Sequence, residues 1–401
     1  MPGNERPLRT IGAAERRARL AIRHRLAPGW HAANVVEVAR DVVGLLADDM
    51  AAAHLSACAR LIRPSVEAMA RALHDDRVLV PLPGRRGTLL VVPTYLAPVI
   101  HAACARTVAD GERRRLVDQV RQSGLVAAAD AAVWLDRLGD RTVAALERRG
   151  EALPGELAAD LPELALGLPT GPTVPASARD SVGRRLLALL EADGRVVRAR
   201  PRRGWTSTGR RWVPMSRWLG DATAPLPAPE ARAALARRWL ASFGPATADD
   251  LAWWAGWAAD TTRAALAGAG TVTVDLDGTP GHVLADDVDP APAVGPWVAL
   301  LPALDCTTMG WRARDWYVDP ALRPALFDRR GNAGPTVWCD GRVVGGWAQR
   351  RDGEVAVRLL SDVGGEAAGE VGIRAASLAA WLGAARVTPR YRTPLERELA
   401  A

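Results

Sequence analysis

One stretch of the chain is crowded with arginine, a residue type well suited to binding phosphate. Between Arg179 and Arg217 lie eleven arginines and only three acids. The eight excess positive charges of this stretch exceed the +7 of the whole chain, so the remainder is nearly neutral. A guanidinium group forms paired hydrogen bonds with a phosphate or a guanine. Charge concentrated in this way is typical of proteins that bind nucleic acid.

The chain contains no lysine, because all 52 of its basic residues are arginine. Schiff-base chemistry needs an amine, so only the α-amino group of the N-terminus could perform it. A composition rich in Ala, Arg and Gly also follows from a GC-rich genome, which is the simpler explanation of the bias. The chemical consequence is the same under either explanation.

The remaining reactive side chains are scattered. No pair of cysteines or histidines has the spacing of a metal site, and we expect reduced thiols and no cofactor; the four cysteines are Cys58, Cys104, Cys306 and Cys339. The N-terminus lacks the apolar segment of a signal peptide, and no apolar run approaches the roughly 18 residues of a membrane span. We therefore expect a cytoplasmic, nucleoid-associated protein without membrane contact. The 15 tryptophans predict a Trp-rich core or, alternatively, a platform for stacking bases.

Three segments share the order helix, strand, turn, strand, which is the order of a winged helix. The first is residues 11–93, with a basic turn at 83–87. Its periodicity predicts helices near 14–26, 34–46, 49–61 and after Pro64, and strands at 77–82 and 88–93.

The second and third segments differ in the charge of their turns. The second, residues 151–220, has a helix near 182–193 and strands at 195–200 and 212–215 around a long basic turn. The third, residues 228–288, has an acidic turn region containing Asp275, Asp277, Asp286 and Asp287. Acids repel phosphate, so we predict a structural role for the third segment.

Two further regions complete the predicted domain organisation. Residues 94–150 are predicted to form a helical connector between the first two segments. Residues 294–401 alternate strand patterns with turns at Asp340-Gly341 and Asp352-Gly353, and a last helix is expected near Ala375–Leu382. The sequence thus predicts an α+β fold with three tandem winged-helix motifs and a C-terminal antiparallel β-rich domain.

The two basic turns supply the candidate DNA-binding residues. We predict phosphate or groove contacts, with solvated charged turns as the alternative, for Arg85, Arg86, Arg202, Arg203, Arg210 and Arg211. Trp205 lies at the tip of the second turn with no obvious core to join, so we predict that it stacks on a base or a lesion. The Gly-rich segment 331–334 is either a tight turn or a weak phosphate-binding loop.

Several longer phrases resemble those of a known family. They are SRWLG (216–220), FGPATADDLAWWAG (243–256), LLPALDCTTMGWRARDWY (300–317), FDRRGNAGPTVWCDGRVVGGWAQ (327–349) and TPLERE near the end. The chain is similar to the winged-helix DNA-binding family of AlkZ/YcaQ-type DNA glycosylases, which repair crosslinks in bacteria. The resemblance covers most of the chain and is strongest from about Trp205 onward. It implies a C-shaped clamp around duplex DNA and hydrolysis of the N-glycosidic bond of bulky or crosslinked alkylpurines without a cofactor.

The catalytic signature of that family is a Gln-x-Gln pair within the phrase GLQAQD. The matching phrase here is GLLADD, residues 44–49. Leu46 therefore stands in place of the first glutamine and Asp48 in place of the second. This departure leaves the predicted fold unaffected and bears directly on the activity.

The chemistry of an alkylated purine shows what such a site needs. An N7-alkylpurine is already cationic and leaves without a strong acid, so the site must position water beside the sugar. Glutamine can position water, whereas the carboxylate of Asp48 can also accept its proton. Leu46 could only widen or dry a substrate pocket, and Asp49 matches an acid of the family but is also placed to cap a helix. We predict catalytic roles for Asp48 and Asp49.

His54 follows these acids on the same predicted helix. It is either a packed helix-face histidine or a second polar group of the site that contacts substrate. With no lysine available, a glycosylase of this sequence would be monofunctional and would leave an intact abasic site.

Two functions of different classes stay open, beside a third possibility, a protein that sequesters adducts on the same binding surface without turnover. The first is a monomeric DNA glycosylase for bulky alkylpurine adducts in duplex DNA, by analogy one that gives a producer of a genotoxic natural product resistance to it. The second is a non-catalytic DNA-binding protein or transcription regulator, which Leu46 favours. Regulators usually carry one winged helix per chain and dimerise, whereas this chain has three unequal copies.

Overall fold

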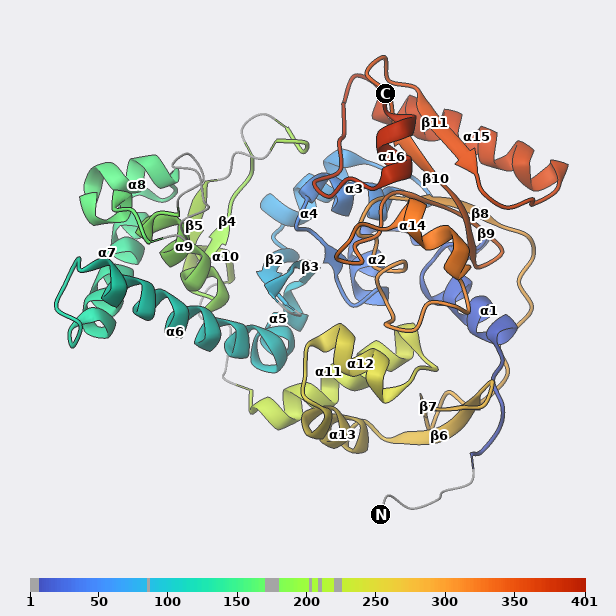
Figure 1. Ribbon diagram of the computed structural model, residues 1–401, viewed down its shortest axis with the longest axis horizontal. Coiled ribbons are helices and arrows are strands. Elements are labelled where there is room, and N and C mark those ends of the chain that lie inside the picture. Colours follow the sequence, from blue (N-terminus) through green and yellow to red (C-terminus); the bar gives the residue numbers. More distant parts are fainter. Residues whose placement is uncertain (1–6, 85–86, 170–179, 202–203, 208–210, 220–225) are drawn as a thin grey trace.

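The computed structural model describes residues 7–84, 87–169, 180–201, 204–207, 211–219 and 226–401. Helices and antiparallel strands are mixed along the whole chain (Figure 1), in agreement with the predicted α+β class. Within the described part, no helix is both long and apolar enough to cross a bilayer.

The first unit is built around a three-stranded antiparallel sheet. Its elements are α2 (Val35–Asp41), β1 (Leu45–Leu46), α3 (Met50–Cys58), α4 (Val66–His74), β2 (Leu79–Pro83) and β3 (Leu89–Pro93). The strand order is β1-β3-β2, and the three helices and the sheet share one apolar core that includes Val38, Leu45 and Leu73. Both strands predicted around the basic turn are confirmed.

The helix predicted at 34–46 is wrong in its second half. Helix α2 ends at Asp41, and the chain reverses through Val43 (φ 52°) and Gly44 (φ 99°). A side chain at Gly44 would have its Cβ 2.8 Å from Val92, so only glycine fits the close approach of the chain to β3. Leu45 and Leu46 then pair with Val91 and Leu90 of β3. Strand pairing and burial outweigh the local helical pattern here.

Helix α1 (Ala13–Arg23) packs against the third unit. Arg23 forms an ion pair of 2.6 Å with Asp287, and Asp277 accepts a 3.0 Å hydrogen bond from the amide of Ala13. The third unit comprises α11 (Ala228–Phe243), α12 (Ala248–Ala255), α13 (Ala259–Gly268), β6 (Thr271–Leu276) and β7 (Thr279–Leu284). Two acids of this unit, Asp277 and Asp287, thus hold α1.

The connector and the second unit follow one another in the chain. Their elements are η2 (Thr94–Leu96), α5 (Ala97–Ile100), the π-helical turn η3 (His101–Ala105), α6 (Arg106–Ser123), α7 (Ala131–Arg149), α8 (Pro154–Asp160), η4 (Pro162–Ala165), α9 (Val182–Ala192), β4 (Val196–Arg198), β5 (Trp212–Pro214) and α10 (Ser216–Leu219). The part from α6 to β5 forms a lobe around a second core (Figure 1, left), whereas η2, α5, η3 and Trp218 of α10 pack in the main core. Strands β4 and β5 pair antiparallel as predicted.

The C-terminal module contains a four-stranded antiparallel sheet of order β11-β10-β9-β8. Its elements are β8 (Val298–Leu301), η6 (Pro320–Leu322), α14 (Arg323–Leu326), β9 (Thr336–Cys339), β10 (Arg342–Gln349), β11 (Val355–Leu359), α15 (Gly365–Leu382) and α16 (Pro394–Leu399). The predicted strands and the helix predicted near 375–382 are confirmed, and this helix, α15, begins ten residues earlier than expected. It is not the last helix, because α16 follows it. Trp239, Trp311 and Trp338 are fully buried, so these tryptophans belong to the core.

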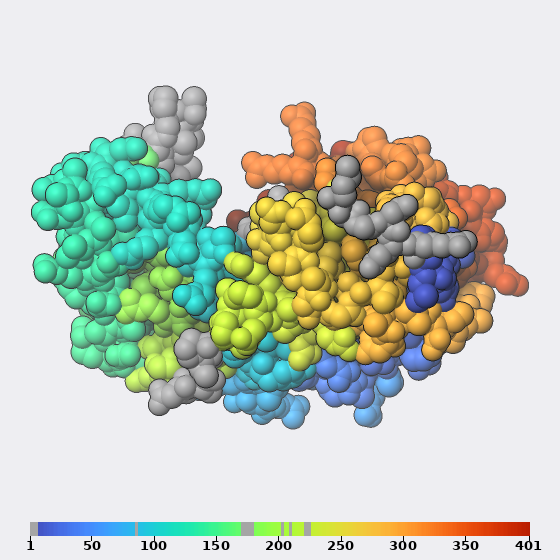
Figure 2. Space-filling model, turned by 90° about the horizontal axis from the view of Figure 1, so that it is seen from below, coloured from blue at the N-terminus to red at the C-terminus, as the bar shows by residue number. Residues whose placement is uncertain are grey.

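The two lobes leave a hollow between them. In Figure 2 the lobe of α6 and α7 (teal) and the yellow and orange part of the chain stand on opposite sides of an open notch. The orange segment, which includes α14, projects at the rim of this notch. The surface of the notch is thus formed by segments that lie far apart in the sequence.

Candidate active site

Asp48 lies in the short loop between β1 and α3, where the backbone of β3 fixes its side chain. The amide of Leu89, the first residue of β3, donates a 3.0 Å hydrogen bond to Oδ1 of Asp48. Arg390 of the C-terminal module donates to the Asp48 carbonyl oxygen at 3.4 Å. The side chain is half-buried, so the carboxylate is oriented by one bond while it stays accessible.

Asp49 occupies a different role from its neighbour. It is the N-cap of α3, and its side chain accepts a 3.0 Å hydrogen bond from the amide of Ala51. A carboxylate at this position satisfies a free amide of the first helical turn and faces the positive end of the helix dipole. Of the two acids predicted as catalytic, the geometry assigns Asp49 to the helix cap.

We expected Leu46 at a substrate pocket, and the structure places it in the main core. It shares a strand with Leu45, but its side chain points into the main core and is only 6% exposed. It packs there within the same cluster as Val43, Leu82 and Leu90. A leucine satisfies this buried position by apolar burial alone.

His54 is packed on the buried face of α3. Its Nδ1 donates a 2.9 Å hydrogen bond to the carbonyl oxygen of Met50, and burial lowers the pKa of the imidazole to about 4. The ring is therefore neutral near pH 7. It lies against Trp205, with 5.1 Å between the ring centroids.

Trp205 has a core to join, contrary to our expectation. Besides His54 it contacts Trp381 of α15, at 5.6 Å between centroids, and packs on the apolar cluster of the C-terminal module. The turn of the second unit thus reaches across to the other lobe. No sequence pattern indicates this contact, because the three aromatic residues lie far apart in the chain.

An apolar cavity of about 320 Å³ opens between this turn and the first unit. Its walls include Met50, His54, Ala70, His74, Pro81 and Trp205. Burial, helped by the charge of Arg200, lowers the pKa of His74 to about 4. Both histidines of the cavity are therefore neutral at physiological pH, and the walls are suited to an apolar or aromatic group.

The predicted arginine contacts have different outcomes. Arg85, Arg86, Arg202, Arg203 and Arg210 lie outside the described residues. The predicted DNA contact of Arg211 is corrected, because this residue is only 7% exposed and forms ion pairs of 2.8 Å with both Glu151 and Glu156. A guanidinium held by two carboxylates is a structural group of the second unit and is not free for phosphate.

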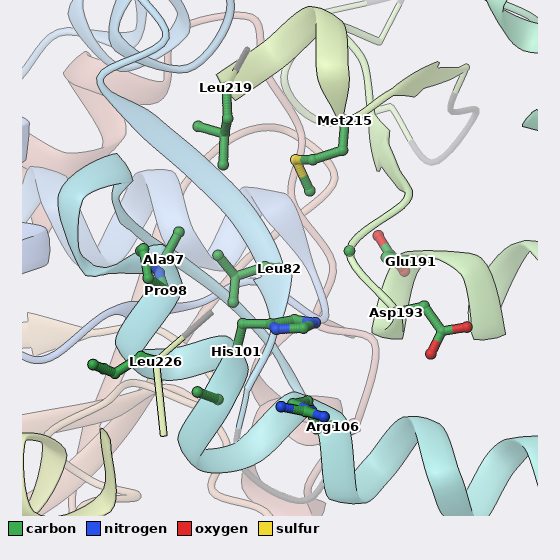
Figure 3. Close-up of a pocket in the computed structure, with 12 residues that line it drawn as sticks. Leu82, Ala97, Pro98, His101, Arg106, Glu191, Asp193, Met215, Leu219 and Leu226 are labelled. Atoms are coloured by element: carbon green, nitrogen blue, oxygen red, sulfur yellow. The ribbon is translucent and has the colours of Figure 1, made fainter. Parts of the chain in front are cut away.

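A second cavity, of about 330 Å³, lies where η3, the end of α9 and α10 meet (Figure 3). His101 and Arg106 stand on one side of it, across from Glu191 and Asp193. None of its lining residues comes from the loop of Asp48 or from α3. Among the described residues, no group of three or more His, Cys, Asp or Glu side chains could hold a metal ion.

Comparisons with known proteins agree with this architecture. A model of the family described as DNA glycosylase AlkZ-like matches residues 39–386. Among solved structures, the DNA glycosylase AlkZ of Streptomyces sahachiroi matches with a TM-score of 0.68 and 20% sequence identity, over 94% of this chain and 98% of that chain. At that identity the structural likeness shows a common fold. A search of curated proteins gave no match.

Proposed function

The chain belongs to the AlkZ-like DNA glycosylase family, and we propose that it is a monofunctional glycosylase for bulky or crosslinked N7-alkylpurines in duplex DNA. The observation that carries the proposal is the placement of Asp48. Its side chain is half-buried, with one carboxylate oxygen fixed by the Leu89 amide, and it belongs to the phrase that resembles the family's catalytic signature.

Asp48 acts on water in this proposal. Because Oδ1 accepts from Leu89, the carboxylate has a fixed orientation, and its other oxygen accepts a proton from a water beside the sugar. A base of this kind works best when it is held at hydrogen-bond distance from the proton that it accepts. Its negative charge also stabilises the positive charge that develops on the deoxyribose.

The reaction balances without a cofactor or an external acid. The water oxygen forms a bond to C1′ while the bond from C1′ to the purine nitrogen breaks. The bonding electrons neutralise the cationic ring, so the alkylpurine leaves as a neutral base. The water proton goes to Asp48, and the product is an abasic site in an intact strand.

The apolar cavity beside α3 supports the proposal that the protein recognises a bulky alkyl group on the purine. Met50 and His54 belong to the helix that Asp49 caps, and Trp205 closes the far wall. Neutral rings bind an apolar or aromatic adduct by stacking and desolvation. Trp205 and His54 are thus proposed as substrate contacts of the adduct itself.

We propose that the three units are winged helices and that the hollow of Figure 2 receives the duplex. The first unit supports this with helix, strand, two helices and two strands, in that order. A single chain with several DNA-binding units does not need a partner subunit to surround DNA. The adducts of a genotoxic natural product are the bulky lesions that such a site would meet in a producing organism.

A single-turnover assay tests the proposal. Duplex oligonucleotides carry one N7-alkylguanine whose alkyl group ranges from methyl to a large aromatic system, and alkali converts each abasic site into a strand break. We expect abasic product, formed faster with the large adduct than with methyl, above a control without protein. DNA binding without product from any adduct would support the non-catalytic DNA-binding alternative instead.

A further inference from the structure

A wide, strongly basic cleft lies on the C-terminal module. It has a volume of about 1190 Å³ and lies between the segments 312–331 and 390–397. Its walls carry a single acid, Asp328, and eight arginines, which are Arg312, Arg314, Arg323, Arg329, Arg330, Arg390, Arg392 and Arg397. This concentration of charge is separate from the arginine-rich stretch of the second unit.

Part of this charge is compensated and part is not. Acids outside the cleft form ion pairs with three of the arginines: Asp249 with Arg312, Asp315 with Arg323, and Glu396 with Arg392. Arg329, Arg330 and Arg397 are exposed, and within the described chain they have no ion-pair partner. Like charges held this close repel one another, and a bound polyanion relieves that repulsion.

The cleft is preformed rather than a loose collection of side chains. Asp328 accepts hydrogen bonds of 2.8 and 2.9 Å from the amides of Arg330 and Asn332, which holds the turn that presents Arg329 and Arg330. Arg314 donates to the carbonyl oxygen of Gly331 at 3.1 Å and lies 4.9 Å from the ring of Phe327. The backbone that carries these arginines is therefore fixed before any ligand binds.

The cleft borders the candidate active site. Arg390 lines the cleft and donates to the carbonyl oxygen of Asp48. Part of the chain drawn in orange also projects at the rim of the hollow between the lobes (Figure 2). A phosphate bound at Arg390 would therefore lie near the loop that contains Asp48.

We infer that this cleft binds the phosphodiester backbone of the DNA strand that contains the target nucleotide. The inference rests on the proposed function and adds a binding site to it. Several guanidinium groups spread along an open cleft suit successive phosphates of one strand. The C-terminal module thereby fixes the register of the strand relative to Asp48, while the cavity beside α3 accepts the adduct.

Fluorescence anisotropy with an undamaged, labelled duplex tests the inference without any turnover. The variant Arg329→Gln/Arg330→Gln removes two charges from the cleft. The matched control, Arg263→Gln/Arg374→Gln, removes two charges from exposed arginines of α13 and α15, outside the cleft. Binding constants are measured over a range of salt concentrations, and thermal unfolding checks that both variants are folded.

Loss of two phosphate contacts should make the slope of log K against log salt concentration shallower by about 1.8. We expect this change, and at least tenfold weaker binding near 0.1 M salt, for the cleft variant only. Equal slopes and affinities for the cleft variant and the control would overturn the inference. Because no base is released in this assay, the inference can fail while the glycosylase activity stands, and the activity can fail while the inference stands.

Discussion

At the scale of single residues, the site depends on which polar groups are free to react. Asp48 has one oxygen fixed by Leu89, whereas the adjacent Asp49 is used as a cap. The replacement of a glutamine by Asp48 substitutes a group that can accept a proton for one that can only position water. Of the two residues that stand in place of the glutamine pair, Leu46 is buried and apolar. Asp48 is therefore the one that can supply a polar side chain to the proposed site.

The buried histidines make stability depend on pH. Burial, reinforced by the charge of Arg60, lowers the pKa of His24 to about 3, and its Nδ1 lies 2.8 Å from Thr307 Oγ1. Below pH 6.5 the unfolded chain binds a proton at this histidine and the folded chain does not. The free energy of unfolding therefore decreases as the pH is lowered. The loss is about 1.4 kcal/mol per pH unit for each such histidine.

The variant His24→Gln tests this effect, because glutamine can still bond to Thr307 and does not titrate. Urea unfolding at pH 6.5 and pH 5 should show a decrease in the free energy of unfolding that is smaller by about 2 kcal/mol in the variant than in the wild type. A decrease of the same size in both proteins would show that His24 does not contribute to the acid sensitivity.

At the scale of elements, the loop between β1 and α3 positions the site. Strand β1 fixes the chain just before Asp48 through its pairing with β3, and the cap of Asp49 fixes the start of α3 just after it. The two neighbouring aspartates of this loop thus have different partners: Asp48 accepts from Leu89 of β3, and Asp49 caps α3.

Asp49→Ala should lower the free energy of unfolding by about 1 kcal/mol, because the first turn of α3 loses its cap. Asp49→Ser should keep the stability, since serine is also a good N-cap. The rate of base release should change by less than threefold in the serine variant. If a stable Asp49→Ser protein released the base much more slowly than the wild type, Asp49 would be a catalytic residue.

Much of the element order is predictable from the sequence, because it follows from periodicity and turn residues. The hairpins β6–β7 and β9–β10–β11 and most helices lie where the pattern places them. The end of α2 is not predictable in this way, since the short strand after it exists only through its pairing with β3. Pairing partners 44 and 46 residues apart leave no local signal.

The site is less predictable than the fold for the same reason. The roles of Asp48 and Asp49 were open to sequence reasoning because both residues lie in one recognisable phrase. The contact from Arg390 to Asp48 joins residues 342 positions apart, and the contacts of Trp205 join two lobes. Arg211 looked free because its two glutamate partners lie about 55 and 60 residues earlier.

At the scale of the whole molecule, a buried ion pair connects the C-terminal module to the first unit. Arg60, just beyond α3, and Asp305 are both fully buried, with a distance of 2.7 Å between Nη2 and Oδ1. Breaking one partner of such a pair leaves an isolated buried charge and costs about 3–5 kcal/mol. The module that carries Arg390 is therefore fixed to the helix that follows Asp48.

The composition of the whole chain predicts a monofunctional enzyme. Without lysine, no side chain can form a Schiff base with the abasic sugar. Sodium borohydride added during the reaction should trap no covalent complex between protein and DNA, and strands should stay intact until alkali is added. Efficient trapping would point to the N-terminal amine and contradict a purely hydrolytic mechanism.

The most direct test of the central claim compares wild type with Asp48→Asn in single-turnover release of an N7-alkylguanine from duplex DNA. Asparagine can keep the bond from Leu89 and position water, but it cannot accept the proton. We expect DNA affinity to change by less than twofold and the rate to fall at least tenfold, about 1.4 kcal/mol of barrier. An Asp48→Asn protein that releases the base at the wild-type rate would contradict the account.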